Sequence, residues 1–400
     1  MKFEKKYVLY LLISLILSYL IISISGNKEI WLKKTWTLFN VPRMWPAFAD
    51  IDFIYRSLVC KQMGLDPFVN NPCAISATTY QYPVIWLHIF EFFSINTIFN
   101  LKILLFFTLS LLFISFCCIF QITKNKFNKF ILLLLFFSGS TLLLIERGNI
   151  DHIVFILCFA ILFSNNYYYE IVLIFINSCL KIYPLFNFIY LLKKKNFYLT
   201  LIIILITILF IYEISFARYF APNHPFMAIS QAYGILTIVE GFFKILEKKY
   251  LISISFEIKS LIRIFFVFIF LIISFFIFLL GSKHNQKLTN IKSGNYEKLF
   301  ILGASIYVGT YIFFSNIDYR LIFLILTVPY ISTLRKLENY LYSIILVIIF
   351  NSWLFQLSPL TLTHSVYTAF LFLLKMMVFI YLSFYLGKLI GNFFLRFKVR

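Results

Sequence analysis

The chain has 400 residues, of which 62% are hydrophobic and 13% are charged, and its formal net charge is +20. So little polar surface cannot coat a water-soluble globule of this size, which excludes an ordinary soluble protein. The basic residues lie between apolar runs and no nucleic-acid-binding motif accompanies them, so the positive charge does not indicate a nucleic-acid partner. Apolar runs long enough to cross a hydrocarbon core of roughly 30 Å recur throughout, which predicts an all-α polytopic membrane protein of about twelve helices.

The N-terminal part predicts one helix and then a long external segment. The first apolar run, residues 7–25, follows a cluster of lysines and lacks a small-x-small cleavage site, so we expect an uncleaved helix that leaves the cytoplasm. Residues 26–98 then form the first external loop, ending in a shallow or re-entrant stretch at 82–98. Cys60 and Cys73 share this loop and could form a disulfide.

The rest of the chain predicts further spans in a single membrane domain, residues 1–400. Proline breaks the apolar run at 169–192 into two short helices that meet at Lys181-Ile182-Tyr183-Pro184. Residues 217–259 form a second external loop. The other expected helices are 99–121, 130–145, 150–164, 197–216, 261–280, 299–315, 320–334, 340–356 and 366–388.

Charge sets the expected orientation. The connectors assigned to the cytoplasm are rich in lysine and arginine, and they hold only four of the 16 acidic residues, namely Glu4, Glu170, Glu297 and Glu338. Because basic residues concentrate in cytoplasmic connectors, we expect a multi-pass protein of the cell (inner) membrane with both termini inside.

The unusual polar residues fall on the non-cytoplasmic side of this topology. Ionisable residues at or below the membrane surface are costly, so they usually pair with each other or face a watery cavity. A cavity open to the outside is therefore expected, bordered by Asp50, Asp52, Asp66, Glu146, Arg147, Asn149, Asp151, Lys181, His224, Asp318 and Arg320.

Structural interpretations of the same residues stay open. Asp50 could be a helix N-cap and Asp66 part of a turn. Lys181 could extend its ammonium toward the membrane surface. Internal ion pairs would equally explain the charged turns at 146–151 and 318–320.

Several function classes lack support. The chain contains no Walker A loop, no G-x-S-x-G and no H-E-x-x-H, so nucleotide-driven transport and the common hydrolase mechanisms are not indicated. Six cysteines occur without C-x-x-C spacing or histidine pairing, which gives no sign of a metal site.

Six short motifs, taken in order, resemble a known family. The chain is similar to the GT-C glycosyltransferases, particularly the polyprenyl-phosphate-mannose-dependent mannosyltransferase-like group of bacterial membrane proteins. The motifs are Phe48-Ala49-Asp50, Gly64-Leu65-Asp66-Pro67-Phe68, Tyr82-Pro83, Glu146-Arg147-Gly148-Asn149-Ile150-Asp151, Lys181-Ile182-Tyr183-Pro184 and Asp318-Tyr319-Arg320. The resemblance implies a polyprenyl-phosphate sugar donor, transfer to an acceptor glycan or glycolipid on the outer face, and an essential aspartate in the first external loop.

Under this resemblance Asp50 is the catalytic residue, because it fits the family's spacing to the Gly-x-Asp-Pro-aromatic turn better than Asp52 does. It would accept the proton of the attacking acceptor hydroxyl while Lys181, Arg147 or Arg320 offsets charge on the departing polyprenyl phosphate. The residues expected to bind substrate are Asp52, Tyr55, Asp66, Tyr82, Glu146, Arg147, Asn149, Asp151, Lys181, His224, Asp318 and Arg320. No cofactor is required, and nothing in the sequence demands a divalent cation. The chain departs from the family pattern at Arg56, where a second tyrosine commonly follows the first.

Three other functions compete with the transferase. A transporter or flippase of lipid-linked saccharides would use a similar cavity, but its essential residues should line both halves of the membrane. An O-antigen polymerase or ligase should depend on arginines of a large external loop. A non-catalytic scaffold predicts that alanine at Asp50 is silent.

Overall fold

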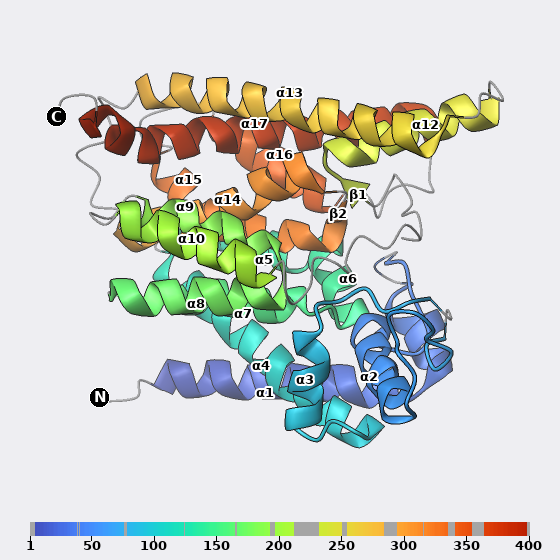
Figure 1. The fold of residues 1–400 in the computed structure, drawn as a ribbon. Helices are drawn as coiled ribbons and strands as arrows, with labels where there is room; N and C mark the ends of the chain where they lie inside the picture. The colour runs from blue at the N-terminus through green and yellow to red at the C-terminus, as the bar shows by residue number, and fades with distance from the viewer. Residues whose placement is uncertain are drawn as a thin grey trace. The chain divides into compact units, whose positions relative to one another are not determined.

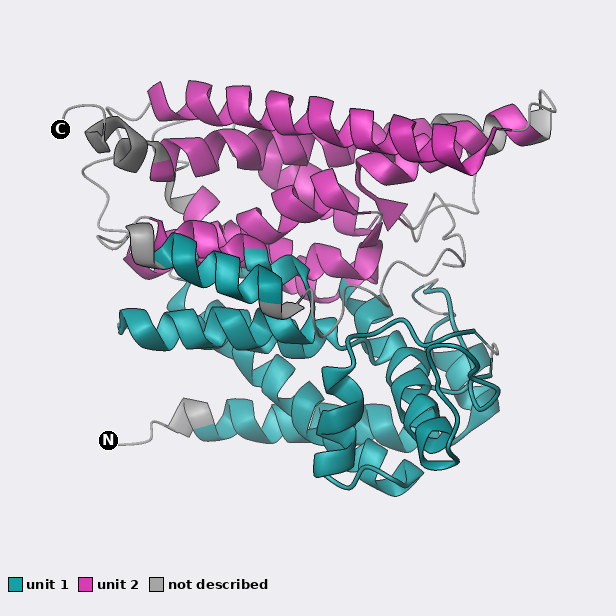
Figure 2. Ribbon diagram, in the orientation of Figure 1, with its two compact units in different colours: residues 1–129, 141–185, 198–224 teal, residues 130–140, 186–197, 225–400 magenta. Residues whose placement is uncertain are grey.

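A computed structural model describes residues 5–37, 39, 41–75, 78–123, 125–164, 166–192, 197–211, 232–249, 254–283, 294–314, 316–334, 341–353 and 364–397. The described elements are helices apart from one pair of two-residue strands, so the predicted all-α class is confirmed. The chain divides into two compact units (Figure 2). Unit 1 contains residues 1–129, 141–185 and 198–224, and unit 2 contains residues 130–140, 186–197 and 225–400.

Unit 1 is built on a row of packed helices (Figure 1). Helix α1 (Lys5–Ser25) packs on α4 (Ile98–Ile122), α4 packs on α7 (Asp151–Ile161), and α7 packs on α8 (Tyr167–Leu180). Helix α10 (Phe197–Ile211) also belongs to this unit except for its first residue. The helices predicted at 7–25 and 99–121 are thereby confirmed.

Serines allow α1 to pack closely inside a membrane environment. Ser14 and Ser18 are fully buried, and their hydroxyls donate to the carbonyl oxygens of Tyr10 (2.7 Å) and Ser14 (2.9 Å) within the same helix. Ser14 also lies beside Cys117 of α4. Because the hydroxyls are satisfied and the side chains are small, the two helices approach without burying an unpaired polar group.

The segment predicted to be external, residues 26–98, carries three short helical pieces: a π-helical turn, η1 (Ile30–Thr35), α2 (Ala49–Gln62) and α3 (Ile85–Phe92). With 8 residues, α3 is about 12 Å long, which is too short to cross a hydrocarbon core of about 30 Å. Helix α3 by itself is therefore not a full span, and the shallow or re-entrant position of residues 82–98 stays a prediction. Cys60 and Cys73 form a disulfide, as the sequence allowed.

Unit 2 is organised around α14 (Gly294–Phe313), which is buried along most of its length. It packs on α17 (His364–Phe397) and on the 3₁₀ helix η6 (Asp318–Thr327). Strands β1 (Ala232–Tyr233) and β2 (Asn316–Ile317) pair antiparallel. Other described helices of the unit include α9 (Phe188–Leu191), α12 (Ile235–Lys249), α13 (Phe256–Lys283), α15 (Val328–Leu334) and α16 (Leu341–Trp353).

Glycines bring α13 and α17 together. A Cβ atom added at Gly281 would lie 2.0 Å from the carbonyl oxygen of Phe384, and one added at Gly387 would lie 2.0 Å from that of Phe278. Each helix therefore uses a glycine where the partner's backbone touches it. This close approach is typical of helices that associate in lipid, where packing replaces the hydrophobic driving force.

The structure differs from the sequence prediction in the number of long helices. Within the described residues, α1, α4, α13 and α17 contain stretches long and apolar enough to cross a membrane. A fifth span results if α5 (Lys126–Phe136) and α6 (Gly139–Arg147) count as one bent helix. Four further apolar helices are shorter, so the predicted count of about twelve spans is not confirmed.

A second difference lies in the segment expected as an external loop at 217–259. Its described part contains α12, whose glutamates pair with α13 through Glu240–Arg263 and Glu247–Lys259. Helix α13 begins at Phe256, five residues before the predicted start at 261. Charged residues on one face of α12 made the sequence look like a loop.

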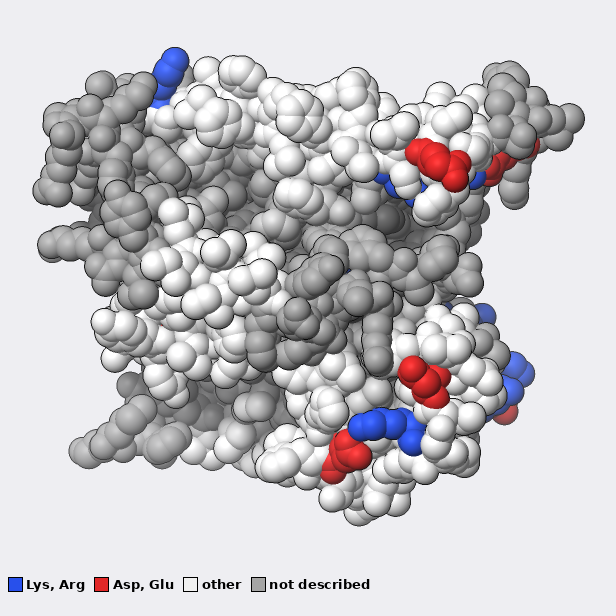
Figure 3. Space-filling view, in the orientation of Figure 1, with Lys and Arg blue, Asp and Glu red and all other residues white. Residues whose placement is uncertain are grey.

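Charge is unevenly distributed over the surface (Figure 3). In unit 1 the visible charged side chains lie around α2 and α3. In unit 2 they lie over α12 and the ends of α13, whose residues 264–282 carry no charge. Long uncharged helices with exposed leucine, isoleucine and phenylalanine are features of a membrane protein.

Candidate functional site

The site in unit 1 starts at the first turn of α2. Phe48 adopts a left-handed conformation (φ 59°) just before the helix, and its backbone N–H donates to the carbonyl oxygen of Glu146 (3.2 Å). Its ring also packs edge-on against Trp31, with centroids 5.0 Å apart. Asp50 lies in this first turn, where a carboxylate interacts favourably with the positive end of the helix dipole.

Gly148 lets the turn between α6 and α7 lie against α2. Its φ is +56°, and a Cβ atom there would lie 2.7 Å from Phe48 Cβ and 3.2 Å from Ile51 Cγ2. Glycine alone meets both conditions without strain, because it has no Cβ and adopts positive φ freely. The next residue, Asn149, is thereby placed against Asp50.

Asn149 is the hub of a buried polar network. Its Nδ2 donates to Asp50 Oδ2 and lies 3.5 Å from the Tyr82 hydroxyl. Its Oδ1 accepts from Lys181 Nζ (3.1 Å) and from the backbone N–H of Asp151 (3.0 Å). Lys181 also forms an ion pair with Asp151. One amide side chain thus connects the carboxylate of Asp50 to the ammonium of Lys181.

Helix termination positions Lys181. Helix α8 ends at Leu180, whose carbonyl oxygen accepts from Trp86 Nε1 (2.9 Å), and Lys181 is extended (φ −151°, ψ 145°). The predicted helix break at Lys181–Pro184 is confirmed. Lys181 is 3% exposed, and a charge buried to this degree needs a partner, which Asp151 supplies.

Arg147 is the more accessible cation of the site. Its guanidinium lies 3.0 Å from the carboxylate of Glu146, which is fully buried and also accepts from the backbone N–H of Met44 (2.6 Å). The side chain of Arg147 is 20% exposed, whereas that of Lys181 is 4% exposed. A ligand at the surface of unit 1 would therefore meet Arg147 before Lys181.

Asp50 is partly exposed, yet its pKa is shifted. Burial raises the pKa of Asp50 above its ordinary value, and the charge of Arg147, the hydrogen bond from Asn149 and the charge of Lys181 oppose the shift. A raised pKa makes the carboxylate a stronger base than a free aspartate.

Three residues predicted to bind substrate, in α2 and in the loop after it, have other contacts. Asp52 forms an ion pair with Arg56 (2.6 Å) and is nearly buried. The Tyr55 hydroxyl lies 3.4 Å from the carbonyl oxygen of Asn96. Asp66 is exposed and accepts from the backbone N–H of Phe68 (3.0 Å), as its turn interpretation predicted. None of these contacts involves the Asn149 network.

Asp318 and Arg320 belong to unit 2. Asp318 is fully buried and its two carboxylate oxygens lie 2.8 and 2.9 Å from Lys375 Nζ, which also donates to the carbonyl oxygen of Ala232 (3.0 Å). Arg320 contacts Asn316 instead. The ion pair that the sequence allowed within this turn therefore forms with Lys375, a residue not singled out from the sequence. His224 lies outside the described residues.

The described residues include no group of three or more His, Cys, Asp or Glu side chains that could hold a metal ion. No family model, curated protein or solved structure matches the chain. What the site offers is a partly exposed carboxylate held by an amide, with a guanidinium and a buried ammonium nearby. A carboxylate can take a proton from a hydroxyl, and a guanidinium binds phosphate oxygens well.

Proposed function

We propose that the protein is a membrane glycosyltransferase that moves a sugar from a polyprenyl-phosphate donor to an acceptor glycan or lipid on the non-cytoplasmic face. The observation that carries the proposal is the network in which Asn149 joins the Asp50 carboxylate to Lys181. The family resemblance supports the same reaction, since its essential aspartate corresponds to Asp50.

The proposed reaction assigns one task to each group. The acceptor hydroxyl attacks the anomeric carbon, and Asp50 takes its proton. The bond between the anomeric carbon and the phosphate oxygen breaks, and its electron pair leaves with the polyprenyl phosphate. Arg147 is the more exposed of the two cations and offsets that charge. Lys181 is paired with Asp151, and its role is to hold Asn149 in place.

The proposed topology places this site outside the cytoplasm, in a protein with about twelve spans and both termini inside. The disulfide Cys60–Cys73 supports this side, because disulfides persist in oxidising compartments. The short helix α3 supports it too, since a further full span there would reverse the orientation of α4. The donor carries its own activation as a phosphate linkage, so the reaction needs no nucleotide.

Mass spectrometry of surface glycans and lipid-linked sugars tests the proposal. Wild type is compared with Asp50→Asn and with a control, Glu29→Gln, which alters an exposed carboxylate outside the network. We expect Asp50→Asn to lose one sugar from the glycan and to accumulate its polyprenyl-phosphate donor, while Glu29→Gln keeps the wild-type profile. An unchanged profile in Asp50→Asn would overturn the transferase and favour a transporter or a scaffold.

A further inference from the structure

Aromatic rings gather beside Asp50 on the same side of α2. Phe53 lies one helical turn after Asp50, so the two side chains share a face of the helix. The Phe53 ring centroid lies 6.2 Å from that of Tyr82 and 6.0 Å from that of Tyr80, and the Tyr80 ring is nearly parallel to it. These rings come from α2 and from the loop that precedes α3.

The three rings differ in exposure, with one buried and two partly exposed. Tyr80 is 2% exposed, packs edge-on against Phe68 with centroids 5.1 Å apart, and its hydroxyl donates to the carbonyl oxygen of Pro83 (3.3 Å). Phe53 and Tyr82 are partly exposed. Tyr80 therefore supports the other two rings from behind, and Phe53 and Tyr82 present surface to a ligand.

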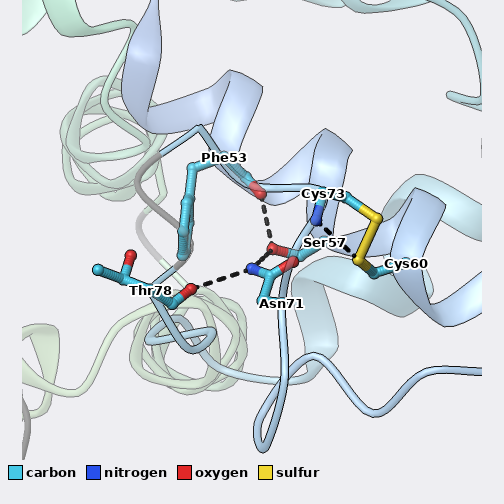
Figure 4. Close-up of a disulfide and its surroundings, with 6 residues drawn as sticks. All are labelled: Phe53, Ser57, Cys60, Asn71, Cys73 and Thr78. Atoms are coloured by element: carbon cyan, nitrogen blue, oxygen red, sulfur yellow. Dashed lines mark hydrogen bonds between the residues drawn. A yellow bond between two sulfur atoms is a disulfide. The ribbon is translucent and has the colours of Figure 1, made fainter.

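A covalent and hydrogen-bonded frame fixes this arrangement (Figure 4). Asn71 Nδ2 donates to Ser57 Oγ (2.9 Å) and to the carbonyl oxygen of Thr78 (3.3 Å). The disulfide joins Cys60, near the end of α2, to Cys73 in the loop. Since the loop leading to Tyr80 and Tyr82 is fastened to α2 at several points, the rings are held in place before any ligand binds.

The aromatic surface ends at the charged network. The Tyr82 hydroxyl lies 3.5 Å from Asn149 Nδ2, and Lys181 Nζ lies 5.6 Å from the Tyr82 ring centroid. A ligand lying on Phe53 and Tyr82 would thus have an apolar surface beneath it and the Asp50 carboxylate at its edge. A pyranose ring has this same division, with C–H groups on its face and hydroxyls around its edge.

We propose that Phe53 and Tyr82 form a stacking subsite for a hexopyranose ring whose hydroxyl groups reach Asp50. This inference rests on the proposed function for its reaction, but the subsite itself is a binding site that can be measured without turnover. A polyprenyl chain would also favour aromatic rings, but it has no hydroxyl groups for the carboxylate and amide at the edge of the rings.

Saturation-transfer NMR on the full-length protein in lipid nanodiscs tests the subsite. The probes are methyl α-D-mannopyranoside, methyl α-D-glucopyranoside and methyl α-D-galactopyranoside. We expect transfer to the ring C–H protons of at least one probe in wild type, and affinity about three- to tenfold weaker in Phe53→Leu and Tyr82→Leu, the range expected for loss of one aromatic contact. Tyr82→Phe keeps the ring and should bind as wild type does.

Controls separate this subsite from the reaction. Phe92→Leu removes an exposed ring elsewhere, 82% exposed, and should leave binding unchanged. Asp50→Asn should lose sugar transfer but keep saturation of the ring protons. If Asp50→Asn leaves the glycans unchanged while stacking persists, the transferase fails and the subsite stands. Two outcomes would overturn the subsite: no saturation transfer to any sugar probe in wild type, or equal sugar binding in wild type and Phe53→Leu. Binding of farnesyl phosphate, but of none of the sugars, would assign the rings to a polyprenyl chain instead.

Discussion

Replacing Gly148 by alanine should destabilise unit 1 in two separable ways. The residue has a φ of +56°, and a left-handed backbone costs an L-residue about 1–2 kcal/mol. The new Cβ would also lie 2.7 Å from Phe48 Cβ, and such overpacking typically costs about 1–3 kcal/mol. The expected loss in the free energy of unfolding is therefore about 2–5 kcal/mol, the sum of these two terms.

Gly64 provides the matched control. Its φ is +82°, but nothing lies within 4 Å of the position of an added Cβ. Gly64→Ala should therefore show only the backbone cost, about 1–2 kcal/mol. Titration with SDS in mixed micelles, followed by tryptophan fluorescence, measures both variants. Sugar transfer should fall much further in Gly148→Ala, because the displaced turn carries Asn149 away from Asp50. Equal losses of stability in the two variants would refute the close approach of this turn to α2.

Three further predictions concern charge and covalent closure. Because burial raises the pKa of Asp50, the stability of wild type relative to Asp50→Asn should be highest at low pH and fall as pH rises through that pKa. Sugar transfer should instead fall as pH drops through the same pKa, because the base becomes protonated. SDS titrations and transfer rates over a pH series measure the two trends, and a stability difference that does not depend on pH contradicts the shift. Lys375→Met should lower the free energy of unfolding in the same titration by about 3–5 kcal/mol, because it leaves Asp318 buried and unpaired. Adding Asp318→Asn should recover much of the loss. No recovery would mean that the ion pair does not cause the loss. Replacing Cys60 and Cys73 by serine opens a loop with a sequence separation of 13 and should cost about 3 kcal/mol, and chemical reduction of wild type should have the same effect.

Local sequence signals predicted the helices whose own residues are enough to specify a helix. The runs at 7–25 and 99–121 are uniformly apolar and long, and α1 and α4 begin and end within two residues of them. The break at Lys181 was also predictable, since Pro184 prevents the helix from continuing. Helix α12 was missed because its stability comes from packing on α13, and its glutamates and lysines look like those of a solvated loop.

Long-range pairs could not be predicted from local signals. Asp318 and Lys375 are 57 positions apart, and neither neighbourhood indicates the other. The basic residue nearest to Asp318 in the sequence is Arg320, but the 3₁₀ geometry of η6 directs that arginine to Asn316. The contact of Asp50 with Asn149 spans 99 positions, and the sequence grouped these residues through the predicted topology and the family resemblance, not through a local signal.

The orientation of the Asn149 side chain follows from the chemistry of its neighbours. The ammonium of Lys181 can only donate, so it takes the amide oxygen, and this leaves the Nδ2 group facing Asp50. The sequence placed Asn149 among the substrate-binding residues, but the amide is fully buried and both of its ends are occupied, so within the proposed mechanism it positions Asp50. Lys181 therefore acts on Asp50 twice, through its charge and through the amide that it orients. Loss of the Lys181 ammonium should release the carboxylate as well as weaken the field around it, so the geometry and the basicity of Asp50 depend on the same ion pair with Asp151.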